Sequence, residues 1–255
     1  MRIPLVYCEE VAEAVTAGQP VVALPSGVIT RGPDGAETAR RAEDAIRASG
    51  SVPATIGVDK GRILVGLSDV DLDRFASARA VPVVDGRDLP VVLAHGTPAA
   101  TTVSSSVVVA ALAGLKFVSS AAIGADLVHL TRSGVVVVCA GAETDPRAAL
   151  EFLESHGVPV VAYRSDDFPG HLRVSSGLRS PHRVDDLPVL VRAIEAHWAL
   201  GNPGSFVVTT PTKASDAADG TEDTSTFSKE AAAVLVTVAE VAGELAAAHA
   251  KEFSG

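Results

Sequence analysis

GVVVVCAGAETDPRAALEFLESHGVPVVAY, at residues 134–163, is the stretch that decides the fold of this chain. Its apolar run at 134–140 predicts a strand that is buried on both faces, which is typical of a parallel sheet. Asp145 followed by Pro146 is typical of a helix start, because aspartate caps the first turn and proline fits its first position. A glycine then ends the helix before a second apolar run at 158–163. This unit predicts parallel strands joined by a helix on one face of the sheet.

The same alternation continues on both sides of that unit. We expect further strands at 19–24, 115–119 and 205–210, and a hairpin at 52–67 that turns at Asp59-Lys60-Gly61. We expect further helices at 37–49, 98–113 (opened by Thr97 and Pro98), 125–131, 187–200 and 228–251. The predicted fold class is α/β, with a mostly parallel central sheet flanked by helices. The predicted parts are an α/β domain at 1–211, an acidic loop or linker at 212–226, and a C-terminal helix at 227–255 docked on the same domain.

The chain is acidic, with 21 basic and 31 acidic side chains in 255 residues and a net charge of −10. Nucleic-acid binding through phosphate neutralisation is not expected, since the chain also has no basic run. A hydrophobic content of 47% excludes intrinsic disorder for most of the chain. Cys8 and Cys139 lie far apart and without Cys/His spacing, which argues against a zinc site and a disulfide framework.

Two features of the sequence bear on its location. The N-terminal MRIPLVYCEEV has acidic residues where a secretory signal has its apolar stretch. The longest apolar stretch, at 231–250, is interrupted by Glu240 and Glu244 and is typical of a packed helix. We therefore expect a cytoplasmic protein that binds neither membrane nor nucleic acid.

Open α/β sheets bind small molecules beyond the carboxyl ends of their strands, so the loops there supply the candidate residues. The candidates for acid–base catalysis are Glu143, Asp126 and His95, and those for substrate binding are Thr30, Arg31, Thr97, Thr101, Thr102 and Thr210. The sequence has no dinucleotide-binding fingerprint, P-loop, nucleophile elbow or metal-spaced histidine cluster, so we expect neither a cofactor nor a metal.

Several of these candidates also have a structural interpretation. Thr97 fits a helix cap, and Glu143 fits an exposed acid favoured by the dipole of the helix that follows it. Arg31 is equally compatible with a solvated side chain, and His95 with a structural histidine. From these residues alone, the sequence predicts a protein that binds a small molecule at the strand ends.

A set of segments occurs in an order and at a spacing that resemble a known family. They are VVAL at 21–24 with Ser26, ETA at 37–39, GSVPATI at 50–56, VGLS at 65–68, RDLP at 87–90, ATTV at 100–103, AALAG at 110–114, ADL at 125–127, VVCAGA at 137–142, GVPV at 157–160 and FP at 168–169. The family is pseudouridine-5'-phosphate glycosidase, also labelled indigoidine synthase A-like, and the resemblance runs from about residue 21 to residue 211. It implies the family's fold and a homotrimer.

The resemblance also implies a chemistry. The family breaks the C–C glycosidic bond of pseudouridine 5'-phosphate to give uracil and ribose 5-phosphate, holding the opened sugar as an imine on a lysine. The resemblance places that lysine at Glu143, and a carboxylate cannot form an imine. It places the family's glutamate at Pro25, its second lysine at Thr97 and an asparagine at Thr210.

One loop of the family is also missing here. It brings a metal-binding aspartate and would lie between Ser120 and Ile123, and the aspartate itself aligns with Ala122. Among the family's substrate contacts, Asp126 and residues 100–102 are kept. Because removal of a covalent nucleophile usually costs many orders of magnitude in rate, we do not expect imine-based glycosidase activity.

Three functions are compatible with this pattern. The first is a repurposed enzyme that carries out acid–base chemistry on a specialised metabolite, such as dehydration, cyclisation or conjugate addition. Its substrate is expected to be larger and less charged than a nucleotide, because two lysines and a loop are absent. The second function is non-catalytic binding. The third is a residual C-glycosidase or C-nucleoside-forming activity on ribose 5-phosphate, using another lysine such as Lys60, Lys116 or Lys213.

Overall fold

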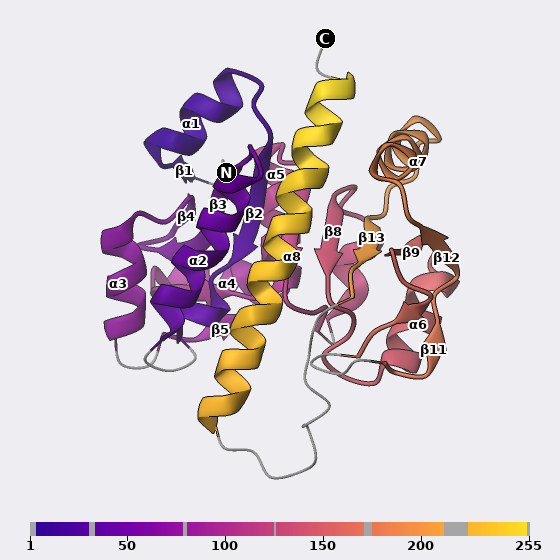
Figure 1. Cartoon of the computed structure of the whole chain (residues 1–255). Coiled ribbons are helices and arrows are strands. Elements are labelled where there is room, and N and C mark those ends of the chain that lie inside the picture. The colour runs from indigo at the N-terminus through magenta and orange to yellow at the C-terminus, as the bar shows by residue number, and fades with distance from the viewer. Residues whose placement is uncertain are drawn as a thin grey trace.

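The centre of the protein is one large mixed sheet (Figure 1), seen in a computed structural model that describes residues 4–30, 34–78, 81–124, 126–170, 175–211 and 224–253. Across the sheet the strands follow the order β1 (Leu5–Tyr7), β4 (Arg62–Val65), β3 (Val52–Asp59), β2 (Val21–Pro25), β7 (Phe117–Ser120), β8 (Val136–Cys139), β13 (Phe206–Thr209), β9 (Val160–Tyr163) and β12 (His182–Val184). β6 (Ala99–Thr101) pairs with β3 and with β5 (Val83–Val84).

Most neighbouring strands in this sheet run parallel, from β3 through β2, β7, β8, β13 and β9 to β12. Antiparallel pairing occurs where β3 meets β4 and where β3 meets β6. β10 (Asp167–Phe168) and β11 (Leu178–Arg179) form a separate antiparallel pair. The predicted fold class, a mostly parallel sheet flanked by helices and followed by a C-terminal helix, is confirmed.

Helices cover both faces of the sheet. One face packs against α1 (Glu9–Thr16), α4 (Leu89–His95), α5 (Val103–Ala113), α6 (Pro146–Ser155) and the 3₁₀ helix η2 (Leu127–Thr131). The other face packs against α2 (Gly35–Ala48), α7 (Leu187–Ala199) and α8 (Thr224–Phe253). A third cluster joins α2 to α3 (Asp69–Ser77) and the 3₁₀ helix η1 (Gly27–Thr30). Strands buried on both faces explain why the sequence has continuous apolar runs instead of alternation.

The stretch at 134–163 folds as its sequence predicts. Val136–Cys139 form the fully buried strand β8, and Val160–Tyr163 form the parallel strand β9. The Asp145 carboxylate caps α6, because its Oδ1 accepts hydrogen bonds from the backbone N–H groups of Arg147 and Ala148. This cap fixes where the chain leaves the end of β8.

The predicted helix start at Thr97 and Pro98 is wrong. Ala99–Thr101 form strand β6 instead, and α5 begins at Val103 with Thr102 as its N-cap. The backbone of this segment pairs with two other strands, and Ala100 N–H also donates to the carbonyl of Pro82 at 2.9 Å. Pairing with distant strands therefore outweighs the local cap-and-proline signal.

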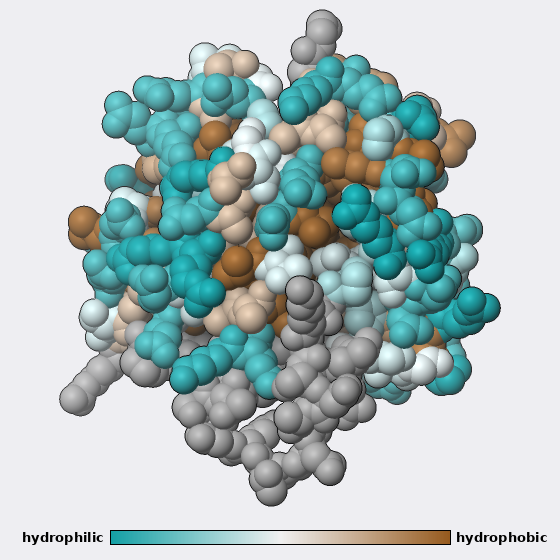
Figure 2. All heavy atoms as spheres, viewed as in Figure 1, coloured by the Kyte–Doolittle hydropathy of each residue, from teal (hydrophilic) through white to brown (hydrophobic). Residues whose placement is uncertain are grey.

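The C-terminal helix α8 crosses the face of the sheet that Figure 1 presents to the viewer, where it packs against α2 and β7. Residues 212–223 of the predicted linker lie outside the described residues, and residues 224–226 are already helical. By length and composition Lys229–Phe253 would suffice to cross a membrane, but half of its most apolar window is buried inside the protein. Figure 2 shows hydrophobic residues along the middle of this face, surrounded by hydrophilic ones.

Candidate functional site

A cavity of about 350 Å³ lies beyond the carboxyl ends of the central strands, where the fold predicts a ligand site. Its lining comes from the loops after β2, β5 and β7, the junction of β6 with α5, the loop after β8, and α8. The lining residues are Pro25, Gly27, Val28, Val83, Asp85, Arg87, Thr101, Thr102, Val103, Ser104, Ser120, Ala121, Ala122, Gly124, Asp126, Glu143, Ala231 and Leu235.

Thr101 belongs to a hydrogen-bond network that holds the inner end of the cavity rigid. Its buried hydroxyl donates to the carbonyl of Ile56 at 2.8 Å and accepts from the N–H of Ser26 at 3.1 Å. The Ser26 hydroxyl in turn accepts from the N–H of Thr101 at 3.0 Å. Since these bonds occupy the Thr101 hydroxyl, its role is to position the two loops.

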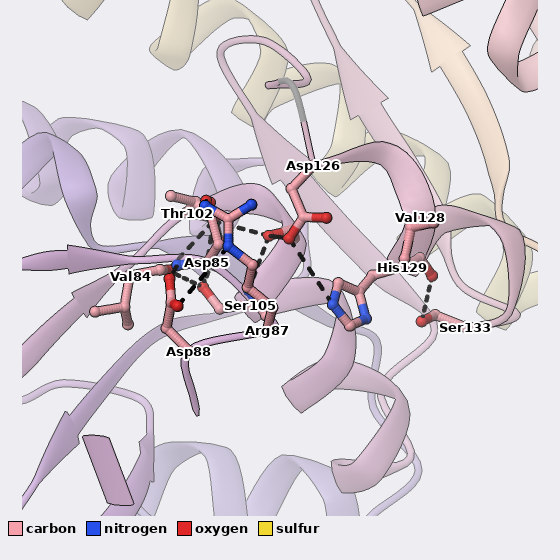
Figure 3. A network of polar contacts seen from close by, with 12 residues as sticks. Val84, Asp85, Arg87, Asp88, Thr102, Ser105, Asp126, Val128, His129 and Ser133 are labelled. Atoms are coloured by element: carbon pink, nitrogen blue, oxygen red, sulfur yellow. Dashed lines mark hydrogen bonds and ion pairs between the residues drawn. The ribbon is translucent and has the colours of Figure 1, made fainter. Parts of the chain in front are cut away.

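Part of the polar lining of the cavity comes from the N-terminus of α5 (Figure 3). The Thr102 hydroxyl donates to Asp85 Oδ1 at 3.0 Å, and the Ser104 hydroxyl donates to Asp126 Oδ2 at 3.1 Å. Arg87 pairs with Asp85 at 3.2 Å, and its side chain is 68% exposed. Two carboxylates from other loops therefore lie at the positive end of this helix.

Glu143 stands at the mouth of the cavity in a loop that is fixed by its backbone. Ala142 bridges to both Ile123 and Gly170, and the N–H of Glu143 donates to the carbonyl of Ile123 at 2.9 Å. The side chain is exposed, and a Cβ at Gly124 would lie 3.7 Å from Glu143 Oε2. The loops after β7 and β8 thus present Glu143 and Asp126 to the same cavity.

Apolar side chains also line the cavity, among them Val28, Val83, Ala231 and Leu235, the last two from the N-terminal half of α8. A cavity lined by apolar side chains together with carboxylates and hydroxyls suits a ligand that has both a polar and an apolar part.

The other predicted site residues lie outside this lining. His95 is exposed at the end of α4, and Thr97 is exposed just after it, beside the turn between β3 and β4. The Thr30 hydroxyl closes a turn by donating to the carbonyl of Gly27, and Thr210 is buried. Arg31 lies outside the described residues. Of the predicted set, the structure brings together Glu143, Asp126, Thr101 and Thr102.

Sequence reasoning missed four residues of this site: Asp85, Arg87, Ser104 and, just behind the lining, His129. Arg87 itself belongs to RDLP at 87–90 of the family resemblance. RDLP begins two residues after Asp85, and ADL at 125–127 ends two residues before His129. That proximity was the available signal. Their meeting depends on long-range contacts between η2, α5 and the loop after β5, which no local pattern encodes.

Lysine does not line the cavity in the part of the chain that the structure describes. Lys116 precedes β7 at the opposite end of the sheet, where its ammonium lies 4.8 Å from the Trp198 ring and 3.9 Å from Glu195 Oε1. Lys60 lies in the turn between β3 and β4, and Lys213 lies outside the described residues. Cys139 at the end of β8 is also no nucleophile, because burial raises the pKa of its thiol to about 12.

The cavity also lacks the metal-binding aspartate that the family resemblance implies. The resemblance implies a metal-binding aspartate at the position of Ala122, whose side chain has no ligand atom. Among the described residues, no three His, Cys, Asp or Glu side chains are placed to hold one ion. The residues present do not fit that metal.

Residues 10–244 match the family described as indigoidine synthase A like protein. The chain belongs to the indigoidine synthase A-like family. It is 48% identical over 244 residues to pseudouridine-5'-phosphate glycosidase of Dickeya dadantii, which covers 89% of this chain and 77% of that relative. It is 50% identical over 236 residues to pseudouridine-5'-phosphate glycosidase 1 of Photorhabdus laumondii, covering 86% and 74%.

Two solved structures have a fold like that of this chain. The prealnumycin C-glycosynthase AlnA, in complex with ribulose 5-phosphate, superposes with a TM-score of 0.89 and 32% identity, covering 100% of this chain and 99% of AlnA. An indigoidine synthase A-like protein from Thermotoga maritima has a TM-score of 0.81 and covers 96% of each chain, and at 24% identity it supports the fold alone. The family resemblance inferred from the segments at 21–211 is confirmed.

Proposed function

We propose that this member of the family is an acid–base enzyme that acts on a small specialised metabolite without forming a lysine imine. The observation that carries this proposal is the placement of Glu143 and Asp126 on one cavity whose described lining contains no lysine. Glu143 stands where the family resemblance implies the imine-forming lysine. A carboxylate at that position can donate or accept a proton but cannot form an imine.

The cavity supports a substrate with little negative charge. Asp85 and Asp126 already lie at the N-terminus of α5, held by Thr102 and Ser104. A phosphate brought to the same helix end would meet both carboxylates, and Arg87, which pairs with Asp85, offsets only one of these negative charges. A sugar-like molecule that has hydroxyls for this end and an apolar part for the apolar side chains of α8 fits these surroundings.

Dehydration illustrates how the two carboxyl groups would work together. Asp126, ionised, takes a proton from a substrate carbon, and the electron pair of that C–H bond forms a C=C bond. The C–O bond of a neighbouring hydroxyl breaks as Glu143, protonated, donates its proton to the departing oxygen. Water leaves, and transfer of one proton from Asp126 to Glu143 through solvent restores both groups. Cyclisation and conjugate addition use the same pair with a nucleophile inside or outside the substrate.

The test compares wild type with Glu143→Gln on a bacterial metabolite extract analysed by mass spectrometry. We expect a compound that wild type consumes and Glu143→Gln does not, while Glu151→Gln, an exposed glutamate on α6, behaves as wild type. Glutamine has the shape of glutamate but cannot donate a carboxylic proton, so an unchanged turnover would contradict the role of Glu143. Borohydride treatment with ribose 5-phosphate should leave the mass of the protein unchanged, and an adduct would contradict chemistry without an imine.

A second candidate is C–C bond chemistry at a sugar carbon. The full-length likeness to AlnA favours it, since that C-glycosynthase was solved with ribulose 5-phosphate bound. For this chain it requires a lysine other than residue 143, and Lys213 is the sequence candidate nearest the strand ends. Cleavage of pseudouridine 5'-phosphate to uracil, lost in Lys213→Arg and kept in Glu143→Gln, would favour this candidate over the first.

Non-catalytic binding of a small molecule is the third function compatible with the sequence. A compound that copurifies with the protein and is recovered unchanged from it, with no wild-type-dependent turnover of any extract, would support binding alone. The homotrimer and the cytoplasmic location implied by the sequence also stay predictions, and light scattering of the purified chain tests the first of them.

A further inference from the structure

Behind the cavity wall, a histidine lies against the carboxylate that the proposed function uses as a base. His129 Nε2 is 3.8 Å from Asp126 Oδ2, within ion-pair distance when the imidazole is protonated. The two side chains are 17% and 12% exposed, so solvent screens this contact only partly. Figure 3 shows the imidazole of His129 pointing toward the carboxylate of Asp126.

Gly86 is the residue that makes this contact possible. A Cβ at residue 86 would lie 2.6 Å from Cδ2 of His129, so the ring lies directly on the glycine backbone. The N–H of the same glycine donates to Ser104 Oγ at 3.0 Å, and Ser104 donates to Asp126 Oδ2. One glycine therefore supports both neighbours of the Asp126 carboxylate.

Both contacts fall on the same oxygen of Asp126. Oδ2 accepts the Ser104 hydroxyl and faces His129, whereas Oδ1 forms no hydrogen bond with any described residue. Because Asp126 also lines the cavity, this arrangement leaves one oxygen for a substrate proton while the other is held from behind. The arrangement resembles the general pattern in which a second side chain orients a catalytic group through its far atom.

The other charged side chains near His129 are either exposed or paired with one another. α5, which packs against η2, has no titratable side chain, and the three charged residues of α6, Arg147, Glu151 and Glu154, are exposed. In the loop below the ring, Arg87 pairs with Asp85 at 3.2 Å and with Asp88 at 3.8 Å. Arg132, three residues after His129, is exposed. Asp126 is thus the described carboxylate paired directly with the imidazole.

We propose that His129 is a positioning residue that holds Asp126 oriented toward the cavity. This role rests on the proposed function, in which Asp126 takes the substrate proton. A protonated imidazole 3.8 Å from Oδ2 attracts the carboxylate, and the Ser104 hydroxyl donates to the same oxygen, so the carboxylate is held from two sides.

NMR of the histidine side chains at one fixed pH tests the contact without any substrate. We expect the ring signals of His129 to move in Asp126→Asn, because the neighbouring negative charge is removed. Gly86→Ala displaces the ring and should move the same signals, whereas Glu151→Gln on α6 should leave them unchanged. Exposed His156 and His182 serve as internal references in each spectrum.

The result that overturns the proposal is a set of His129 ring signals that is the same in wild type and Asp126→Asn. This outcome differs from a failure of the proposed function, which would appear as an absence of turnover with the contact intact. Once a substrate is in hand, His129→Gln should lower kcat and leave KM within about twofold. A purely structural histidine would change stability without changing kcat.

Discussion

The carbonyl oxygen of Pro169 lies where a side chain on Gly141 would begin, since a Cβ at residue 141 would be 1.8 Å from that oxygen. Gly141 also has φ +96°, a conformation that L side chains rarely adopt. Its carbonyl accepts from the N–H of Ile123, and the N–H of Ala142 donates to Pro169. The chain segments that follow β7, β8 and β10 meet at this point, and Glu143 follows two residues later.

Gly141→Ala should therefore destabilise the protein and displace Glu143. We expect the free energy of unfolding, measured by urea denaturation, to fall by at least about 2 kcal/mol because of both the clash and the strained φ. Gly157→Ala is the matched control, because Gly157 has φ +69° but open space around its Cβ position. It should cost only about 1 kcal/mol. Equal losses in the two variants would show that the contact with Pro169 is unimportant.

The buried carboxyl of Glu43 makes the free energy of unfolding depend on pH, and this dependence can be measured separately from the candidate site. Burial raises the pKa of its carboxyl, and the hydrogen bond from Thr55 and the charge of Arg47 only partly oppose this. Because the folded pKa lies above the unfolded one, Glu43 contributes stability below its unfolded pKa and loses that contribution as pH rises through the folded pKa. We expect the unfolding free energy of wild type minus that of Glu43→Gln to decrease with pH over this range.

Urea denaturation at a series of pH values measures this difference. Glu37→Gln, at an exposed position on the same helix, should show no such trend. A difference that rises with pH for Glu43→Gln would mean that Arg47 and Thr55 stabilise the carboxylate more than burial destabilises it.

The two cysteines should differ in reactivity. Burial raises the pKa of both thiols, but Cys139 is fully buried at the end of β8, with a pKa of about 12, whereas Cys8 is only half-buried. In the native protein at pH 8 we expect a maleimide to label Cys8 slowly and Cys139 not at all. Both should be labelled in denaturant. Peptide mass spectrometry reports each site, and native labelling of Cys139 at the rate of Cys8 would contradict its burial.

Ala231 tests whether α8 takes part in ligand binding. Ala231→Trp places a large side chain in the cavity from a half-buried position, so binding of any copurified or identified ligand should be lost. Ala233→Trp puts the same side chain on an exposed part of the helix, outside the lining. We expect similar thermal midpoints for both variants and lost binding for the first alone. Retained binding in Ala231→Trp would remove α8 from the site.

The sequence predicted the parts of the fold that depend on local signals. The run at 134–140, the cap at Asp145 and the hairpin around Lys60 follow from periodicity, capping and turn chemistry, and each forms as expected. The strand at Ala99–Thr101 was missed because its partners, β3 and β5, come from elsewhere in the chain. A cap-and-proline signal cannot reveal such pairing.

The residues of the candidate site also divide into those that the sequence predicted and those that it did not. Glu143 and Asp126 follow predicted elements at the carboxyl edge of the sheet, so their approach to one cavity was predictable. His95 was misplaced together with the helix start at Thr97, since the loop there faces the turn between β3 and β4. His129 was missed because its position depends on the packing of its ring against the backbone of Gly86, 43 positions earlier in the chain. A single sequence does not indicate which glycine a given ring packs against.

The contribution of α8 to the cavity has a consequence for the order of events during synthesis. Every other described lining residue has been translated by the time Glu143 is added, but Ala231 and Leu235 follow about ninety residues later. The sheet and its remaining helices can therefore begin to assemble on the ribosome while one wall of the cavity is still missing. A nascent chain stalled before α8 should have no ligand-protected state, and ligand would act only on the last step of maturation.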